Sequence, residues 1–249
     1  VSEQCAATVK KVSMELGGNA PFIVFDDADM DAAIDGAMAS KYRNTGQTCV
    51  CANRFLVQDG VYDEFAEKLA AASDKMRVGP GLKGETEQGP LIDMAAVEKV
   101  EEHIQDALDK GARIVTGGKR HELGGSFFQP TVIANVNTQM KVAREETFGP
   151  LAPLLRYHTD DEAVYLANDT EFGLSASVFT NDMWKIDRAV HELRAGLIKI
   201  NGPTTGSEIH APFGGEKNSS GHAAREQGDT AQEFFTRTRT AYIKPGLSY

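Results

Sequence analysis

Short apolar runs alternate with helical patterns along the whole chain. Residues 22–25 form a continuous apolar run of strand length, and acidic residues that favour a helix start follow directly. The clearest helix is expected at 95–110, where Val97, Val100, Ile104, Ala107 and Leu108 line one face. Other expected strands are 12–14, 54–57, 114–115, 131–133, 151–155, 176–179 and 197–200, and other expected helices end near 41 or cover 62–69, 160–168 and 182–194. This alternation predicts an α/β fold with a mostly parallel sheet flanked by helices.

The pattern changes near the C-terminus. Residues 232–243 combine Phe, Thr and Tyr in a way that indicates an extended segment, and Lys244 and Pro245 follow. A strand at the end of a chain often pairs outside its own domain. We therefore expect residues 229–249 to form an oligomerisation arm, which predicts a homo-oligomer.

Composition narrows the class of protein. The 249 residues are 41 % hydrophobic and 25 % charged, with a net charge of −10, which disfavours nucleic acid as a partner. No apolar run reaches the roughly 18 residues of a membrane span, and residues 1–4 do not resemble a secretory signal. The cysteines are Cys5, Cys49 and Cys51, which do not make a disulfide framework. We expect a cytoplasmic protein with reduced thiols, no membrane contact and no metal site.

Cys49 and Glu15 are the first candidates for chemistry. Cys49 follows a glycine turn, and we expect it just before or at a helix, where free amides would stabilise a thiolate. Glu15 follows the expected strand 12–14 and precedes two glycines, a position at a strand end where α/β folds bind ligands. The alternatives are a small buried cysteine and a surface or helix-capping carboxylate. Together, a thiol nucleophile and a carboxylate base make a chemically complete pair.

Several motifs, taken in order, resemble those of the aldehyde dehydrogenase superfamily. They are Glu-Leu-Gly-Gly at 15–18, Gly-Gln-Thr-Cys at 46–49, Glu-Glu-Thr-Phe-Gly-Pro at 145–150, Asn-Asp-Thr-Glu-Phe-Gly-Leu-Ser at 168–175 and Pro-Phe-Gly-Gly at 212–215. The resemblance covers essentially the whole chain. It implies the fold of an aldehyde dehydrogenase catalytic domain.

The resemblance also assigns roles. Cys49 would attack the aldehyde carbon, and its backbone amide would supply half of an oxyanion hole. Glu15 would activate the water that hydrolyses the resulting thioester. Glu146 resembles the carboxylate that binds the nicotinamide ribose, Phe148 the ring beside it, and Leu16 the residue whose backbone lies by the nicotinamide. The cofactor would be NAD or NADP, and the sequence does not distinguish the two.

The family's cofactor-binding domain precedes the glutamate motif, and only residues 1–18 could represent its end. The expected domains are therefore a remnant at 1–18, a catalytic domain at 19–228 and the arm at 229–249. No glycine-rich dinucleotide motif and no counterpart of the family's oxyanion asparagine is found. We expect an expression fragment, a proteolytic remnant or a truncated gene product, which alone would not turn over substrate. A non-catalytic module with a redox or assembly role is the alternative.

Two residues indicate the substrate. Within the family, residues 41–54 are similar to succinate-semialdehyde dehydrogenases, where Arg43 matches the arginine that holds the distal carboxylate. The alternative is that Arg43 pairs with a structural acid. Residues 201–211 look more like α-ketoglutarate-semialdehyde dehydrogenases, and there Ser207 is a weaker candidate for a second carboxylate contact. Both resemblances imply a small aldehyde with a carboxylate at its far end.

Cys51 lies two residues after Cys49, the expected nucleophile. It resembles the redox-switch cysteine of some succinate-semialdehyde dehydrogenases. A disulfide across one residue would be strained and therefore labile. The alternative is a small packing residue.

Overall fold

The computed structural model describes residues 1–221, 225–244 and 246, and it is built around one seven-stranded sheet. The strand order is β3-β4-β5-β2-β1-β7-β8, and every neighbouring pair is parallel except β3 with β4. The strands are β1 Ala20–Val24, β2 Ala52–Gln58, β3 Arg113–Thr116, β4 Thr131–Val136, β5 Leu151–Tyr157, β7 Ser175–Phe179 and β8 Leu197–Ile200, and a separate ribbon pairs β6 Phe172–Gly173 with β9 Glu216–Lys217. The expected α/β fold with a mostly parallel sheet is confirmed.

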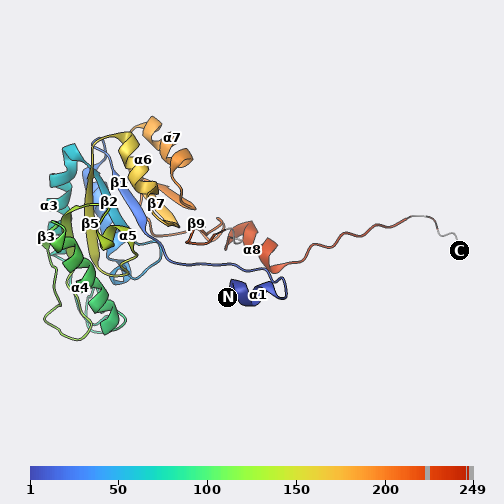
Figure 1. Ribbon diagram of the computed structural model, residues 1–249, viewed down its shortest axis with the longest axis horizontal. Helices are drawn as coiled ribbons and strands as arrows, with labels where there is room; N and C mark the ends of the chain where they lie inside the picture. Colours follow the sequence, from blue (N-terminus) through green and yellow to red (C-terminus); the bar gives the residue numbers. More distant parts are fainter. Residues whose placement is uncertain (222–224, 245, 247–249) are drawn as a thin grey trace.

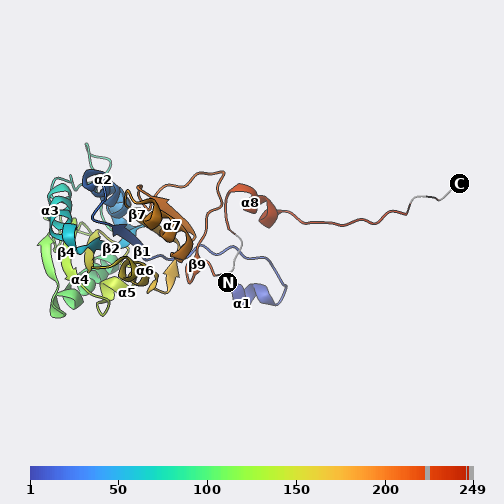
Figure 2. The same cartoon turned by 90° about the horizontal axis from the view of Figure 1, so that it is seen from above.

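Helices cover both faces of this sheet (Figures 1 and 2). Side chains of α2 and α3 pack in one apolar cluster, and side chains of α4, α5, α6 and α7 pack in the other. The helices are α1 Ser2–Ala6, α2 Met30–Lys41, α3 Tyr62–Ser73, α4 Met94–Asp109, α5 Lys141–Arg144, α6 Asp160–Asn168, α7 Met183–Glu192 and α8 Gly228–Phe235, with short 3₁₀ turns η1 Arg43–Gly46 and η2 Asp59–Val61. The molecule is therefore a three-layer α/β/α sandwich.

The alternation of β1 shows how the sequence specifies the two clusters. Phe22 and Val24 belong to the cluster under α2 and α3, while Ile23 belongs to the opposite one. Successive side chains of a strand point to opposite faces, so a continuous apolar run is what a strand buried on both faces requires. The edge strand β8 is less buried, and all four of its residues are only half-buried. Leu108 likewise lies at the exposed margin of α4 rather than on its buried face.

The helix boundaries follow local capping. Asp29 accepts a hydrogen bond from the Ala32 amide at the start of α2, at 3.1 Å, and Asp93 accepts one from the Ala96 amide at the start of α4, at 2.9 Å. Such caps satisfy amides that have no partner within the helix. Helix α2, which leads toward the candidate site, ends at Lys41, and the turn η1 begins two residues later at Arg43.

The chain enters β1, β2 and β5 from the motif segments identified in the sequence. Because these strands are parallel neighbours, their amino-terminal ends meet at one edge of the sheet. Residues 15–19, 47–51 and 146–150 therefore converge there. The expected strand at 12–14 is wrong, since residues 10–19 have no regular structure. The expectation that Glu15 lies at the carboxyl end of a strand fails with it.

The two ends of the described chain leave the sandwich (Figure 1). Residues 232–235, expected to be extended, form the end of α8, and only 236–244 lack regular structure. Within the described residues this stretch pairs with no strand, and Phe235, Tyr242 and Ile243 are 82 %, 95 % and 85 % exposed. No helix of the described part of the chain is long and apolar enough to cross a membrane.

Candidate active site

Cys49 lies in a turn between η1 and β2, and its side chain is half-buried. The expected position at a helix start is wrong, because η1 ends at Gly46 and β2 begins at Ala52. Gly46 has a φ of +75°, and a Cβ there would stand 2.1 Å from the Gly149 carbonyl oxygen. Only glycine fits this position. The turn before Cys49 is therefore locked against the Glu-Glu-Thr-Phe-Gly-Pro segment.

Gly17 and Gly18 lie between Glu146 and the turn that carries Cys49. A Cβ on Gly18 would stand 2.2 Å from the Cys49 carbonyl oxygen, and one on Gly17 would stand 2.7 Å from Glu146 Oε2. The Gly18 amide donates a hydrogen bond of 2.9 Å to Glu146 Oε1. Because Gly17 and Gly18 have no side chains, their backbone can lie close to both the Cys49 carbonyl and the Glu146 carboxylate.

Glu15 is held by the segment 219–220, far away in the sequence. The Leu16 amide donates to the Ser219 carbonyl at 2.9 Å, and Ser220 Oγ donates to Glu15 Oε1 at 3.4 Å. Glu15 Oε2 is buried and has no hydrogen-bond partner among the described residues. Burial, with a smaller contribution from the charge of Glu226, raises the pKa of Glu15. A carboxylate with a raised pKa and a free lone pair suits a general base.

The charges around Cys49 show which groups face its thiol. Burial is the largest cause of the raised pKa of Cys49, and the carboxylates of Glu15 and Glu146 raise it further. The backbone amides of Cys49 and Val50 act in the opposite direction and lower the pKa. The expected amides are therefore present, but burial and the two carboxylates outweigh them. The expectation of a stabilised thiolate is therefore not supported by this structure, in which the net effect of these groups raises the pKa of Cys49.

A partly apolar surface flanks Glu146. Phe148 has a φ of +57°, an unfavourable conformation for a large side chain, and its ring is 38 % exposed. Leu16 is 46 % exposed. Burial raises the pKa of Glu146, and its hydrogen bond from the Gly18 amide lowers it. Glu146 is thus an anchored carboxylate, and the nearby Leu16 and Phe148 leave apolar surface exposed.

Comparison with known proteins decides the family. The sequence profile of the aldehyde dehydrogenase family matches residues 1–241. The chain belongs to the aldehyde dehydrogenase family.

Individual relatives agree with this assignment. The 3-sulfolactaldehyde dehydrogenase of Pseudomonas putida is 62 % identical over 216 residues, covering 87 % of this chain and 44 % of that protein. The NADP⁺-dependent succinate-semialdehyde dehydrogenase of Escherichia coli strain K12 is 59 % identical over 217 residues, covering 87 % and 45 %. The crystal structure of an NAD-dependent aldehyde dehydrogenase from Sinorhizobium meliloti superposes with a TM-score of 0.93 at 39 % identity, covering 100 % of this chain and 49 % of that one. The chain spans less than half the length of the curated relatives it matches.

In this aldehyde dehydrogenase chain, Arg43 and Ser207 are both exposed. Within residues 1–221, 225–244 and 246, Arg43 makes no ion pair and no side-chain hydrogen bond, so no described acid accounts for it structurally. Ser207 lies in the loop between β8 and β9, and it too makes no hydrogen bond to a described residue. Both polar groups are free to meet a ligand.

Cys51 differs sharply from Cys49. Its side chain is 1 % exposed, and its Sγ donates to the Lys41 carbonyl at 3.5 Å. Burial is the main cause of its raised pKa. All three cysteines are free thiols. Cys51 is therefore a packed thiol, and a disulfide to Cys49 would require its side chain to rotate away from the Lys41 carbonyl.

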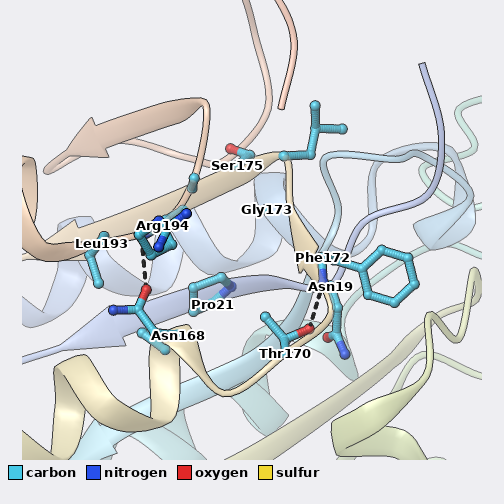
Figure 3. Close-up of a pocket in the computed structure, with 13 residues that line it drawn as sticks. Asn19, Pro21, Asn168, Thr170, Phe172, Gly173, Ser175, Leu193 and Arg194 are labelled. Carbon is cyan, nitrogen blue, oxygen red and sulfur yellow. Dashed lines mark hydrogen bonds between the residues drawn. The ribbon is translucent and has the colours of Figure 1, made fainter. Parts of the chain in front are cut away.

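Two cavities lie near the site, and neither Cys49 nor Arg43 is among the described residues that line them. A small cavity of about 10 Å³ lies beside Asn19, Thr170 and Phe172 (Figure 3). It has room for one water, which would satisfy the buried and unpartnered Asn19 Oδ1. A cavity of about 470 Å³ lies between Ser13 and α8, near Glu15.

Sequence reasoning missed the groups that hold these residues in place. Ser219 and Ser220 position the Glu15 segment, and Asn53 Nδ2 donates to the Gly18 carbonyl at 3.3 Å. The side chain of Lys41 is completely buried beside Asn53. No local signal marks these residues, because each acts across a contact between segments distant in sequence.

Proposed function

We propose that this chain carries the catalytic portion of an enzyme that oxidises a small ω-carboxylated aldehyde to the acid, with succinate semialdehyde as the favoured substrate and NAD or NADP as oxidant. One observation carries the proposal: Cys49, Glu15 and Glu146 converge on Gly17 and Gly18 at one edge of the sheet. A nucleophile, a base and a cofactor-binding carboxylate are the groups that the chemistry requires.

Cys49 begins the reaction by attacking the carbonyl carbon of the aldehyde. The thiol proton must leave as the S–C bond forms, and Glu15, with its raised pKa, is the acceptor at hand. The backbone amides of Cys49 and Val50 face the thiol, so that the Cys49 amide can stabilise negative charge on the former carbonyl oxygen. When bound, NAD or NADP supplies the hydride acceptor.

Glu15 acts again in hydrolysis of the thioester formed on Cys49. By then Glu15 has passed the thiol proton to solvent, so that it can take a proton from water; the water oxygen bonds to the acyl carbon, the C–S bond breaks to release the acid, and the Cys49 thiolate regains a proton from Glu15. Its buried Oε2, which has no partner among the described residues, is suited to accept this proton. On the cofactor side, Glu146 would hold the ribose, and Phe148 and Leu16 would flank the ring.

Arg43 supplies the substrate preference. Its guanidinium is free of described acids, and a carboxylate accepts two parallel hydrogen bonds from such a group. Two curated relatives are named as dehydrogenases of succinate semialdehyde and of 3-sulfolactaldehyde, and both of these aldehydes carry an anionic group at the far end. Ser207 is the second candidate contact, and the sequence around it keeps α-ketoglutarate semialdehyde as a second candidate substrate.

Replacement of Arg43 tests the substrate class. In the intact enzyme, Arg43→Ala should raise KM for succinate semialdehyde by at least tenfold more than KM for butanal, since loss of one partner of a charged contact costs about 2–5 kcal/mol. Arg113→Ala is the matched control, because Arg113 is an exposed arginine on β3 at the far edge of the sheet. An equal loss for the charged and neutral aldehydes would refute the assignment of Arg43.

We also propose that residues 229–249 join two copies of the protein. The exposed Phe235, Tyr242 and Ile243 support this, because large apolar side chains gathered on a terminal segment favour burial in an interface. Light scattering should give an oligomer for the wild type and a smaller species when these three residues are changed to Ser. An unchanged mass would show that the segment does not hold the oligomer together.

A further inference from the structure

Lys41 is a buried charge that the proposed mechanism leaves unused. Its side chain is 0 % exposed, and within the described residues no carboxylate lies within ion-pair distance of it. Its Nζ instead donates to the Ala52 carbonyl at 2.9 Å and to Asn53 Oδ1 at 3.1 Å. Burial of an ammonium without a paired acid is unfavourable, so a surrounding structure that retains it must gain something from its hydrogen bonds.

The ammonium determines how Asn53 is oriented. An ammonium only donates, so it selects the oxygen of the Asn53 amide and leaves the nitrogen facing the other way. That nitrogen donates to the Gly18 carbonyl at 3.3 Å. On its other side, the Gly18 amide donates to Glu146 Oε1 at 2.9 Å. Lys41 therefore stands at one end of a chain of hydrogen bonds that fixes Gly18 from both sides and ends on Glu146.

Lys41 contacts the turn that carries Cys49 as well. Its own carbonyl accepts from Cys51 Sγ at 3.5 Å, and Ala52, which its Nζ holds, is the first residue of β2 after that turn. Gly18 lies against the Cys49 carbonyl, so a shift of the Gly18 peptide would also displace Cys49. The chain of contacts thus reaches both reacting sides of the site.

We propose that Lys41 is a positioning residue of this active site, whose buried ammonium orients Asn53 and thereby holds Gly18 between Cys49 and Glu146. It acts through Asn53 and touches neither substrate nor cofactor. The kinetic part of the test rests on the proposed function, whereas the reactivity of Cys49 does not.

Asn53→Asp separates positioning from simple structural support. The new carboxylate would give Lys41 a paired acid, so the melting temperature should stay at or above that of the wild type. The Gly18 carbonyl would lose its donor and face a carboxylate oxygen. The rate of Cys49 alkylation by iodoacetamide, followed by mass spectrometry, should then fall about tenfold, and KM for NAD or NADP should rise, because small displacements at a reacting centre have large effects on rate.

Lys41→Met and Leu69→Ala complete the design. Lys41→Met removes the donor, and we expect the same loss of Cys49 reactivity. Leu69 is fully buried in α3 on the same face of the sheet, so Leu69→Ala reports the effect of lost stability alone. If Asn53→Asp itself lowers the melting temperature, Lys41→Met is compared with Leu69→Ala instead. Each variant is then assayed at the same number of degrees below its own melting temperature. A greater loss of Cys49 alkylation rate in Lys41→Met supports the proposal.

Two results would overturn the positioning role. One is a folded Asn53→Asp variant whose Cys49 is alkylated at the wild-type rate. The other is a loss of Cys49 alkylation rate in Lys41→Met that is no larger than the loss in Leu69→Ala. If wild-type enzyme oxidises no semialdehyde while both variants still slow alkylation of Cys49, the proposed function fails and the role of Lys41 stands.

Discussion

Gly18→Ala is a one-carbon change that should affect catalysis more than folding. The added Cβ would stand 2.2 Å from the Cys49 carbonyl oxygen, a backbone atom that cannot rotate away. Ordinary contacts require about 3.5 Å, so the two segments must separate by roughly 1 Å. The φ of Gly18 is not in the left-handed region, so the effect comes from this contact and not from the torsion angle.

The size of the expected effect follows from that displacement. Forcing an extra carbon into a packed site costs about 1–3 kcal/mol of stability, which a domain of this size can tolerate. A displacement of about 1 Å at the nucleophile, however, lowers the rate by roughly 10²-fold. We therefore expect kcat for semialdehyde oxidation to fall by about two orders of magnitude in the intact enzyme, while the protein remains folded.

Two other glycines provide matched controls. A Cβ on Gly36 would meet the tip of the Phe179 ring at 2.5 Å, in the core under α2, and one on Gly89 would meet nothing within 4 Å. Gly36→Ala should lower the melting temperature with little change in kcat, and Gly89→Ala should change neither. Melting curves, steady-state rates and Cys49 alkylation rates check this. A wild-type kcat in folded Gly18→Ala would refute the reasoning.

Three further predictions concern the titratable groups. Cys49 should be labelled before Cys5 and Cys51 by brief iodoacetamide treatment at alkaline pH, and mass spectrometry showing Cys5 labelled first would remove the basis for the nucleophile. Mild peroxide should form a reversible disulfide between Cys49 and Cys51, at a rate limited by how fast Cys51 leaves its buried position. A peptide that gains oxygen and does not lose two hydrogens would contradict the redox switch. Burial raises the pKa of Glu15, and a general base must be ionised to act. Activity should therefore fall on the acid side at a pH above the pKa of an ordinary glutamate, which is near 4.3. Glu15→Gln should remove this acid limb of the pH profile together with most of the turnover.

The elements that sequence reasoning placed well are those specified by local patterns. The helix at 160–168 and the strand at 197–200 were predicted with the bounds that the structure has. Thr159 caps the former, and a short apolar run marks the latter. The strand expected at 12–14 rested on Val12 and Met14 alone, and in the structure this segment is held through the Leu16 amide by Ser219 from across the fold, not by a neighbouring strand. Pairing at such a distance leaves no trace in a local window.

The site divides in the same way. Motifs identified Cys49, Glu15 and Glu146, since each lies in a short segment with a fixed spacing of glycines. The helix expected to begin at or just after Cys49 is absent because β2 begins at Ala52, only three residues further on. Lys41 would be interpreted from sequence as a solvated cation at a helix end. Its burial depends on β2 packing beside α2, which only the folded chain reveals.

The double glycine explains why the two halves of the chemistry should respond together. Gly17 allows the approach of Glu146, Gly18 allows the approach of Cys49, and a single hydrogen bond joins Gly18 to Glu146. A displacement of this segment therefore cannot move Cys49 without also moving Glu146. Glu15 lies in the same segment, so the base moves with them. Loss of any contact that fixes Gly18 should consequently lower kcat and weaken cofactor binding in one step, whereas loss of Arg43, which lies outside the segment, should affect only the substrate.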